Sequence, residues 1–131
     1  MCNQQKFTDY IRRKCRQLNI EFRIGKGRTV KDPDGTLVDG YFLEPCKLPG
    51  ELVVARKCED FILCLAHEYT HMMQWFHEDP IYNCKDSDYY KLEKTTERDA
   101  LRLLKEWKIN PKRVRTAAKR SSSYLKWLKE K

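Results

Sequence analysis

The sequence predicts an α+β fold, in which a short sheet is combined with several helices. Three observations lead to this class. Apolar residues recur every three to four positions in some segments, alternate with polar residues in others, and fill residues 59–76 almost continuously. At 131 residues, 40% of them hydrophobic and 11% aromatic, the chain is long enough to form one folded domain with its own core.

The first half of the chain contains one predicted helix and three predicted strands. Apolar side chains recur at helical spacing from Phe7 to Leu18, which predicts an amphipathic helix over about residues 8–18. The segment that follows alternates apolar and polar side chains, as a half-buried strand does. Turn residues such as Gly35 separate it from two later apolar segments. The expected strands are residues 20–24, 38–43 and 52–55.

The second half of the chain is predicted to be helical. The segment 59–76 is so apolar that its helix must be buried on most of its circumference. Ser87 or Asp88 is the expected N-cap of a second helix that runs to about residue 108. Asn110-Pro111, an N-cap followed by proline in the first turn, opens a last helical segment. The three serines at 121–123 are expected to weaken or break that segment.

The chain is expected to be a single domain made of a main part, residues 1–110, and a basic C-terminal helical extension, residues 111–131, that packs on it. The extension holds eight basic residues and one acid, so most of the net charge of +8 lies there. There is no apolar run of about 18 residues and no secretory signal pattern, so we expect no membrane partner and a cytoplasmic location. The six cysteines are scattered, without a CxxC pair, which favours free thiols.

The stretch LAHEYTHMMQWFH contains all three histidines of the chain. His67, Glu68 and His71 form the pattern HExxH. On a helix, positions i and i+4 lie about 40° apart on one face, so both imidazoles can bind one zinc ion. Glu68 lies about 100° round from His67, beside the metal, where a carboxylate can take a proton from a zinc-activated water.

The alternative is that these three residues fall at this spacing by chance on a buried helix. A charged glutamate in such an apolar segment would then be buried without a partner, which is energetically costly. A metal ion with its water supplies that partner. We therefore predict one Zn²⁺ per chain, bound by His67 and His71, with Glu68 as the general base.

The third protein ligand is less directly specified. The spacing from His71 to His77 matches the longer pattern HExxHxxGxxH, but Gln74 stands where that pattern has glycine. In an unbroken helix His77 lies about 280° from His67, away from the metal-binding face. The alternative is a carboxylate from the next helix, where Glu93 and Glu97 lie four residues apart on one face.

These residues resemble the gluzincin class of zinc peptidases, in which HExxH is followed by a second helix that bears a ligand glutamate. In that comparison Glu97, with Asp99-Ala100 after it, looks like the segment with the ligand, so the resemblance favours Glu97 over Glu93 and His77. It also implies that Asp99 hydrogen-bonds a zinc-binding histidine.

The order of the elements resembles minimal gluzincins, including phage-type and bacterial regulatory zinc peptidases. The resemblance implies a small zincin-like domain that hydrolyses peptide bonds of a cytosolic protein, with an edge strand within residues 41–55 that pairs with the extended substrate. Such peptidases stabilise the oxyanion with a tyrosine or a histidine. The candidates for that role are Tyr82, Tyr89, Tyr90 and His77.

A second hypothesis concerns the basic extension, residues 111–131, in which Tyr124 and Trp127 stand among lysines. Basic segments with aromatic residues suit a nucleic acid or an acidic partner, and the metal site would then be structural. The extension is also consistent with an amphipathic helix that packs Val114, Leu125, Trp127 and Leu128 on the domain with its lysines in water. Glu68 favours the peptidase, because a structural zinc site has no use for an acid at that position.

Overall fold

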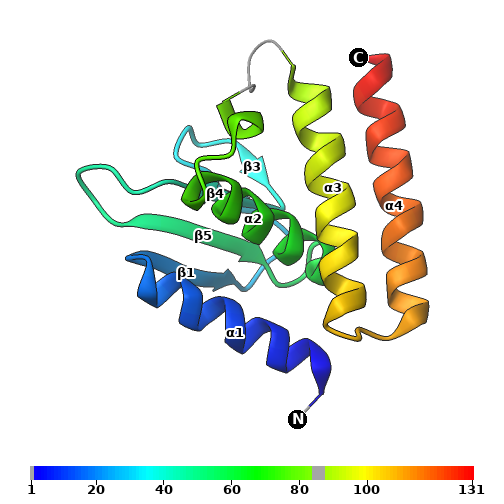
Figure 1. The fold of residues 1–131 in the computed structure, drawn as a ribbon, viewed down its shortest axis with the longest axis horizontal. Helices are drawn as coiled ribbons and strands as arrows, with labels where there is room; N and C mark the ends of the chain where they lie inside the picture. Colours follow the sequence, from blue (N-terminus) through cyan, green and yellow to red (C-terminus); the bar gives the residue numbers. More distant parts are fainter. Residues whose placement is uncertain (1, 84–87) are drawn as a thin grey trace.

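The structure, a computed structural model, describes residues 2–83 and 88–131. It confirms the α+β class, with a small mixed sheet and α-helices before and after it (Figure 1). In chain order the elements are α1 (Asn3–Gln17), β1 (Ile20–Gly25), β2 (Val30–Lys31), β3 (Leu37–Val38), β4 (Gly40–Leu43), β5 (Gly50–Ala55), α2 (Phe61–Phe76), a short 3-10 helix η1 (Pro80–Asn83), α3 (Tyr89–Glu106) and α4 (Pro111–Glu130).

The main sheet has three strands in the order β1-β5-β4. β1 runs parallel to β5, and β4 runs antiparallel to β5, with Phe42 opposite Leu52. The single strand predicted over residues 38–43 is divided at Asp39, because Val38 pairs instead with Val30 of β2 in a small separate hairpin. β4 is therefore the edge strand on one side of the main sheet.

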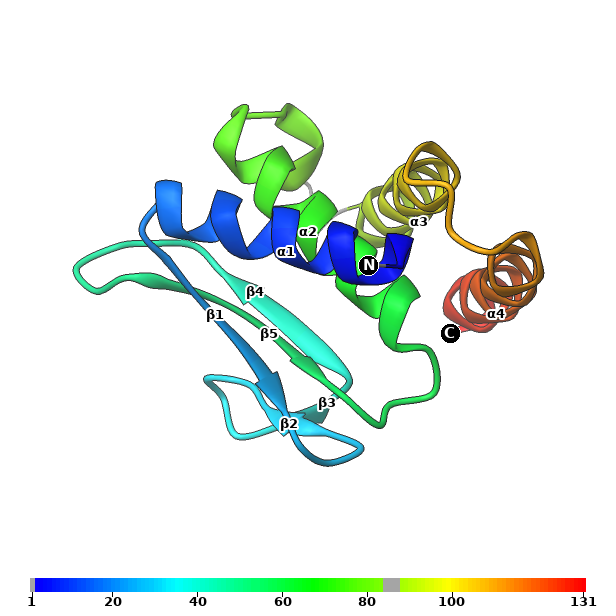
Figure 2. The same cartoon turned by 90° about the horizontal axis from the view of Figure 1, so that it is seen from below.

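Helices α1 and α2 cover the same face of the main sheet, and α3 and then α4 lie beyond α2 (Figure 2). The core between these layers is apolar and includes side chains from both ends of the chain. One part of it is a cluster of aromatic rings, in which Phe7 and Tyr10 of α1 contact Tyr69 of α2 and Trp107 after α3. Burial of α2 between the sheet and α3 explains its nearly continuous apolar sequence.

The helix boundaries follow recognisable capping residues. Asp60 is the N-cap of α2, and its carboxylate accepts a hydrogen bond from the backbone N–H of Leu63 at 3.2 Å. Asp88 precedes α3, while Ser87, the alternative cap, lies outside the described residues. Asn110 caps α4 as predicted, by accepting a hydrogen bond from the N–H of Lys112 at 2.9 Å.

Two predictions about helix extent are wrong. Helix α1 begins at Asn3 rather than near Thr8, because its first turn is polar and carries no apolar period. Helix α4 continues through the three serines at 121–123, since Ser121 is buried against the rest of the protein and packing outweighs the low helix propensity of serine. None of the described helices is long and apolar enough to cross a membrane.

Candidate metal centre

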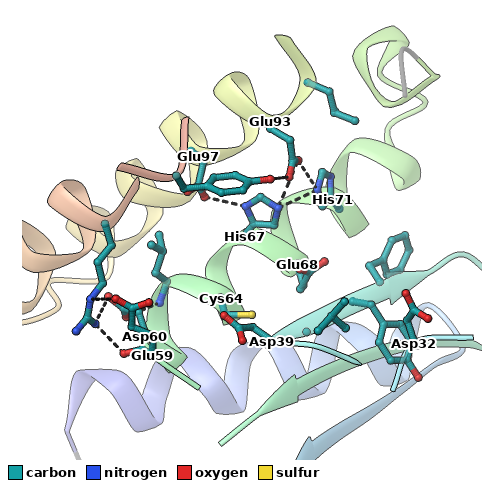
Figure 3. A pocket seen from close by; sticks show the side chains of 18 of the residues that line it. Asp32, Asp39, Glu59, Asp60, Cys64, His67, Glu68, His71, Glu93 and Glu97 are labelled. Atoms are coloured by element: carbon teal, nitrogen blue, oxygen red, sulfur yellow. Dashed lines mark hydrogen bonds and ion pairs between the residues drawn. The ribbon is translucent and has the colours of Figure 1, made fainter. Parts of the chain in front are cut away.

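The site lies at the contact between α2 and α3, in a cleft of about 1000 Å³. The edge strand β4 forms one wall of the cleft, and α2, α3 and α4 form the others (Figure 3). Gly40 lets β4 approach α2 closely: a Cβ atom there would lie 2.8 Å from the Sγ atom of Cys64, one turn before Glu68. The HExxH segment therefore faces both the edge of the sheet and the second helix.

His67, Glu68 and His71 are close enough to hold a metal ion, because one ligand atom from each lies within 4.8 Å of the others. The two histidines face each other through their Nε2 atoms, which are 3.1 Å apart. This is the result of the four-residue spacing on α2, which places both rings on one helix face. The prediction that the pair can share a metal ion agrees with this geometry.

Helix α3 brings both glutamates to this pair, but to different atoms. One carboxylate oxygen of Glu93, Oε2, lies 3.5 Å from Nε2 of His67 and 3.2 Å from Nε2 of His71. Glu97 instead accepts a hydrogen bond from Nδ1 of His67 at 2.8 Å, on the opposite side of that ring. The geometry thus favours Glu93 as the third ligand, the reverse of the choice made from the sequence.

The hydrogen bonds around the rings define which nitrogen of each carries a proton. A carboxylate accepts, so Nδ1 of His67 is the donor to Glu97. The Thr96 hydroxyl donates a hydrogen bond to the carbonyl of Leu92, so its oxygen accepts one from the Gln74 amide nitrogen at 2.9 Å. The Gln74 carbonyl oxygen therefore faces His71 and accepts from its Nδ1 at 2.9 Å. When the two rings are neutral, both Nε2 atoms are therefore left with lone pairs.

Three electron-rich atoms consequently converge on one point: the two Nε2 lone pairs and Oε2 of Glu93. Oε2 is buried and has no hydrogen-bond partner among the described residues. Such an arrangement needs a cation between its members. In a tetrahedral site with bonds of about 2.0–2.1 Å, two ligand atoms lie about 3.4 Å apart, close to the three distances observed here. The residues fit a metal ion.

The charges at the site shift the pKa values of its members. Burial lowers the pKa of His67, but the carboxylates of Glu93 and Glu97 beside the ring outweigh it, and the net pKa is well above the ordinary value. Burial would raise the pKa of Glu93, yet the two histidines beside its carboxylate hold that pKa below its usual range. A proton and a metal ion therefore compete for the same position.

Glu68 lies on the cleft side of α2 and is buried. Burial raises its pKa, the two histidines lower it, and Glu93 and Glu97 raise it, with a net pKa above the ordinary value of a glutamate. A carboxylate with a raised pKa accepts a proton more readily near neutral pH. Glu68 lies beside the two histidines, and its role as the general base stays a prediction.

The remaining predicted residues are distributed around the cleft and outside it. Tyr82 is buried in the cleft wall, with its ring centroid 6.4 Å from that of His71. Tyr89 donates a hydrogen bond to Oε1 of Glu93 at 3.2 Å. Tyr90 and His77 are not among the described residues that line the cleft; His77 is the exposed C-cap of α2.

Asp99 does not take the position implied by the family resemblance. Its carboxylate pairs with Arg102 and Arg98 on the outer face of α3, because it lies two residues beyond Glu97 and so points away from α2. Glu97 occupies the position beside the histidine that was expected for Asp99.

Two residues at the site were missed in the sequence. Gln74 was considered only as the residue that replaces a glycine, and it orients His71. Tyr124 was considered only as part of a basic extension, and its hydroxyl donates to Oε1 of Glu93 at 2.6 Å. The i+3 spacing from His71 to Gln74 was a usable signal, whereas the contact from α4 depends on tertiary packing.

Comparison with protein-family models, with curated proteins and with solved structures found no match to this chain.

Proposed function

We propose that this protein is a zinc-dependent endopeptidase with a zincin-like fold, in which His67, His71 and Glu93 hold the zinc ion and Glu68 is the general base. One observation carries the proposal: Oε2 of Glu93, which has no hydrogen-bond partner among the described residues, lies beside both Nε2 atoms next to a buried glutamate in an open cleft. Two histidines and one glutamate are a ligand set of catalytic zinc sites, which keep a further position open for water or substrate.

The chemistry follows from the residues around that position. When bound, zinc acts as a Lewis acid that lowers the pKa of water towards 7. The carboxylate of Glu68 takes a proton from the attacking water and returns it to the nitrogen of the leaving amine. Glu97 and Gln74 hold the imidazole rings so that both Nε2 lone pairs keep their direction. Tyr82, in the wall near His71, is our candidate for stabilising the oxyanion.

The edge strand β4 supports a peptide as the substrate. Gly40, Tyr41 and Phe42 line the cleft, and β4 is the outer strand of the main sheet. An extended peptide can add to such an edge through main-chain hydrogen bonds. A peptide bound there would pass along α2 in front of Glu68, which places a backbone carbonyl beside the proposed metal position.

A peptide-cleavage assay tests this proposal. The zinc-loaded chain is incubated with a defined mixture of peptides that covers many sequences, and new termini are identified by mass spectrometry. We expect cleavage by the wild type and a loss of at least about 100-fold in Glu68→Gln, the scale of removing a general base. Zinc binding should persist in that variant, because Glu68 is not among the proposed ligands. Equal cleavage by both proteins, or none by the wild type, would contradict the proposal.

A second hypothesis, that the basic helix α4 binds a nucleic acid or an acidic partner, stays a prediction. Lys112, Arg115 and Lys119 are exposed on this helix and could contact a nucleic acid or an acidic partner. Two results would support this hypothesis: binding of the chain to DNA or RNA that weakens steeply with salt concentration, and loss of that binding when these three basic residues are replaced by glutamine. The acid at Glu68 makes the peptidase the better supported function.

A further inference from the structure

The C-terminal helix α4 reaches the metal centre, although its sequence is that of a basic surface helix. Arg120, Tyr124 and Trp127 of α4 all line the cleft. Arg120 donates to the backbone carbonyl of Glu59 at 2.8 Å and to the carboxylate of Asp60 at 3.0 Å. Since Asp60 is the N-cap of α2, this contact ties α4 to the start of the helix that carries both histidines.

One turn further along α4, Tyr124 contacts the proposed third ligand. Its hydroxyl lies 2.6 Å from Oε1 of Glu93, which is the shortest hydrogen bond that this carboxylate makes to a described residue. Glu93 is 96% buried, so water cannot easily replace a lost partner. Tyr124 is itself half-buried and stacks on Trp127, with ring centroids 6.2 Å apart, which limits the movement of its hydroxyl.

The two oxygens of Glu93 are therefore used differently. Oε1 accepts from Tyr124 and more distantly from Tyr89, whereas Oε2 is left for the two histidines. A carboxylate is free to rotate about its last torsion, which is broad and roughly two-fold. A strong donor at Oε1 selects the rotation that directs Oε2 towards the metal position, and it does so before any ion binds.

We propose that Tyr124 is a positioning residue of the metal centre, and that α4 is a required part of that centre rather than an appended extension. This inference rests on the proposed function, because it concerns the same zinc site. It gives a basic C-terminal helix a direct role in metal affinity, which its charge pattern does not suggest.

Zinc affinity measured by competition with a fluorescent zinc chelator tests the inference on the full-length chain. Tyr124→Phe removes the hydroxyl and keeps the ring. We expect zinc affinity to fall by about 10- to 100-fold, the range found when a partner of a ligand is lost. Tyr90→Phe is the matched control, since it removes a tyrosine hydroxyl from α3 outside the cleft lining, and it should leave the affinity unchanged. The metal-free Tyr124→Phe chain should melt at a somewhat lower temperature than the wild type, because a buried carboxylate oxygen loses its donor, but it should still fold; the melting temperature of Tyr90→Phe should be unchanged.

The outcomes separate this inference from the proposed function. A wild-type chain that binds no zinc overturns the proposed function and this inference together. A wild-type chain that binds zinc, with unchanged affinity in Tyr124→Phe, overturns the inference alone. If Tyr124→Phe does not fold, Tyr124→Leu is the second variant without a donor. Loss of fold in both would overturn the inference, because the side chain would then serve the fold and not the metal.

Discussion

Helices α2 and α3 each bring two side chains, four residues apart, to the same place, but with different results. On α2, His67 and His71 direct equivalent atoms to one point, 3.1 Å apart. On α3, Glu93 meets both of these atoms, whereas Glu97 passes to the far side of His67 and accepts from its Nδ1. The spacing on a helix thus tells which residues share a face. It does not tell which atom of the opposite helix each residue meets, because that depends on how the two helices are offset.

The largest effect expected from this comparison is on zinc binding by Glu93→Ala. Removal of a direct ligand should weaken zinc by more than about 100-fold, beyond the range for residues that only support a ligand. Competition with a zinc chelator measures it. Near-wild-type affinity in this variant, together with loss of binding in Glu97→Ala, would reverse the roles assigned to the two glutamates.

A smaller effect is expected for Glu97→Ala. The variant keeps all three proposed ligands but leaves Nδ1 of His67 without its acceptor, so zinc affinity should fall by about 10- to 100-fold. Glu97→Gln is the matched variant, because its amide oxygen can still accept from Nδ1. It should retain more affinity than Glu97→Ala, and an equal loss in both would show that the charge of Glu97, not its hydrogen bond, is what matters.

The smallest effect is expected at Gln74. It accepts a hydrogen bond from Nδ1 of His71, as Glu97 does from Nδ1 of His67, but it carries no charge. Gln74→Leu leaves the N–H of His71 without its acceptor in a half-buried place, which should lower the free energy of unfolding by about 1 kcal/mol. Zinc affinity should fall by about 10-fold, the low end of the range for such partners. Gln74→Glu keeps an acceptor and should preserve affinity. Denaturant unfolding and the same chelator competition measure the two quantities, and unchanged stability in Gln74→Leu would contradict the assigned hydrogen bonds.

Local features of the fold were predictable where one physical cause dominated. The alternation at residues 20–24 and the cap at Asn110 correspond to observed elements. The strand predicted over residues 38–43 was placed correctly but is divided, because the pairing of Val38 with Val30 cannot be read from either segment alone. The serines at 121–123 misled for a similar reason, since their cost is offset by packing against elements far away in the sequence.

The site also divides into residues that are positioned within one helix, which were predictable, and residues that are positioned by packing between helices, which were not. His67, Glu68 and His71 were identified because their geometry is set within one helix. The choice between Glu93 and Glu97 needed the offset of α3 on α2, and the role of Tyr124 needed the contact of α4 across 31 residues of sequence. Family resemblance favoured Glu97 and Asp99, while the hydrogen bonds place Glu97 on the histidine and Asp99 on arginines. Which carboxylate faces a metal is decided by packing.

A crystal structure of the zinc-loaded protein, with anomalous diffraction recorded at the zinc absorption edge, tests the central claim most directly. We expect one anomalous peak, which locates one zinc ion. Nε2 of His67 and Nε2 of His71 should bind this ion at about 2.0–2.1 Å, and Oε2 of Glu93 at about 2.0–2.2 Å, while Glu97 still accepts the hydrogen bond from Nδ1 of His67. A peak bound by Glu97 in place of Glu93, or no peak between the two histidines, would contradict the account.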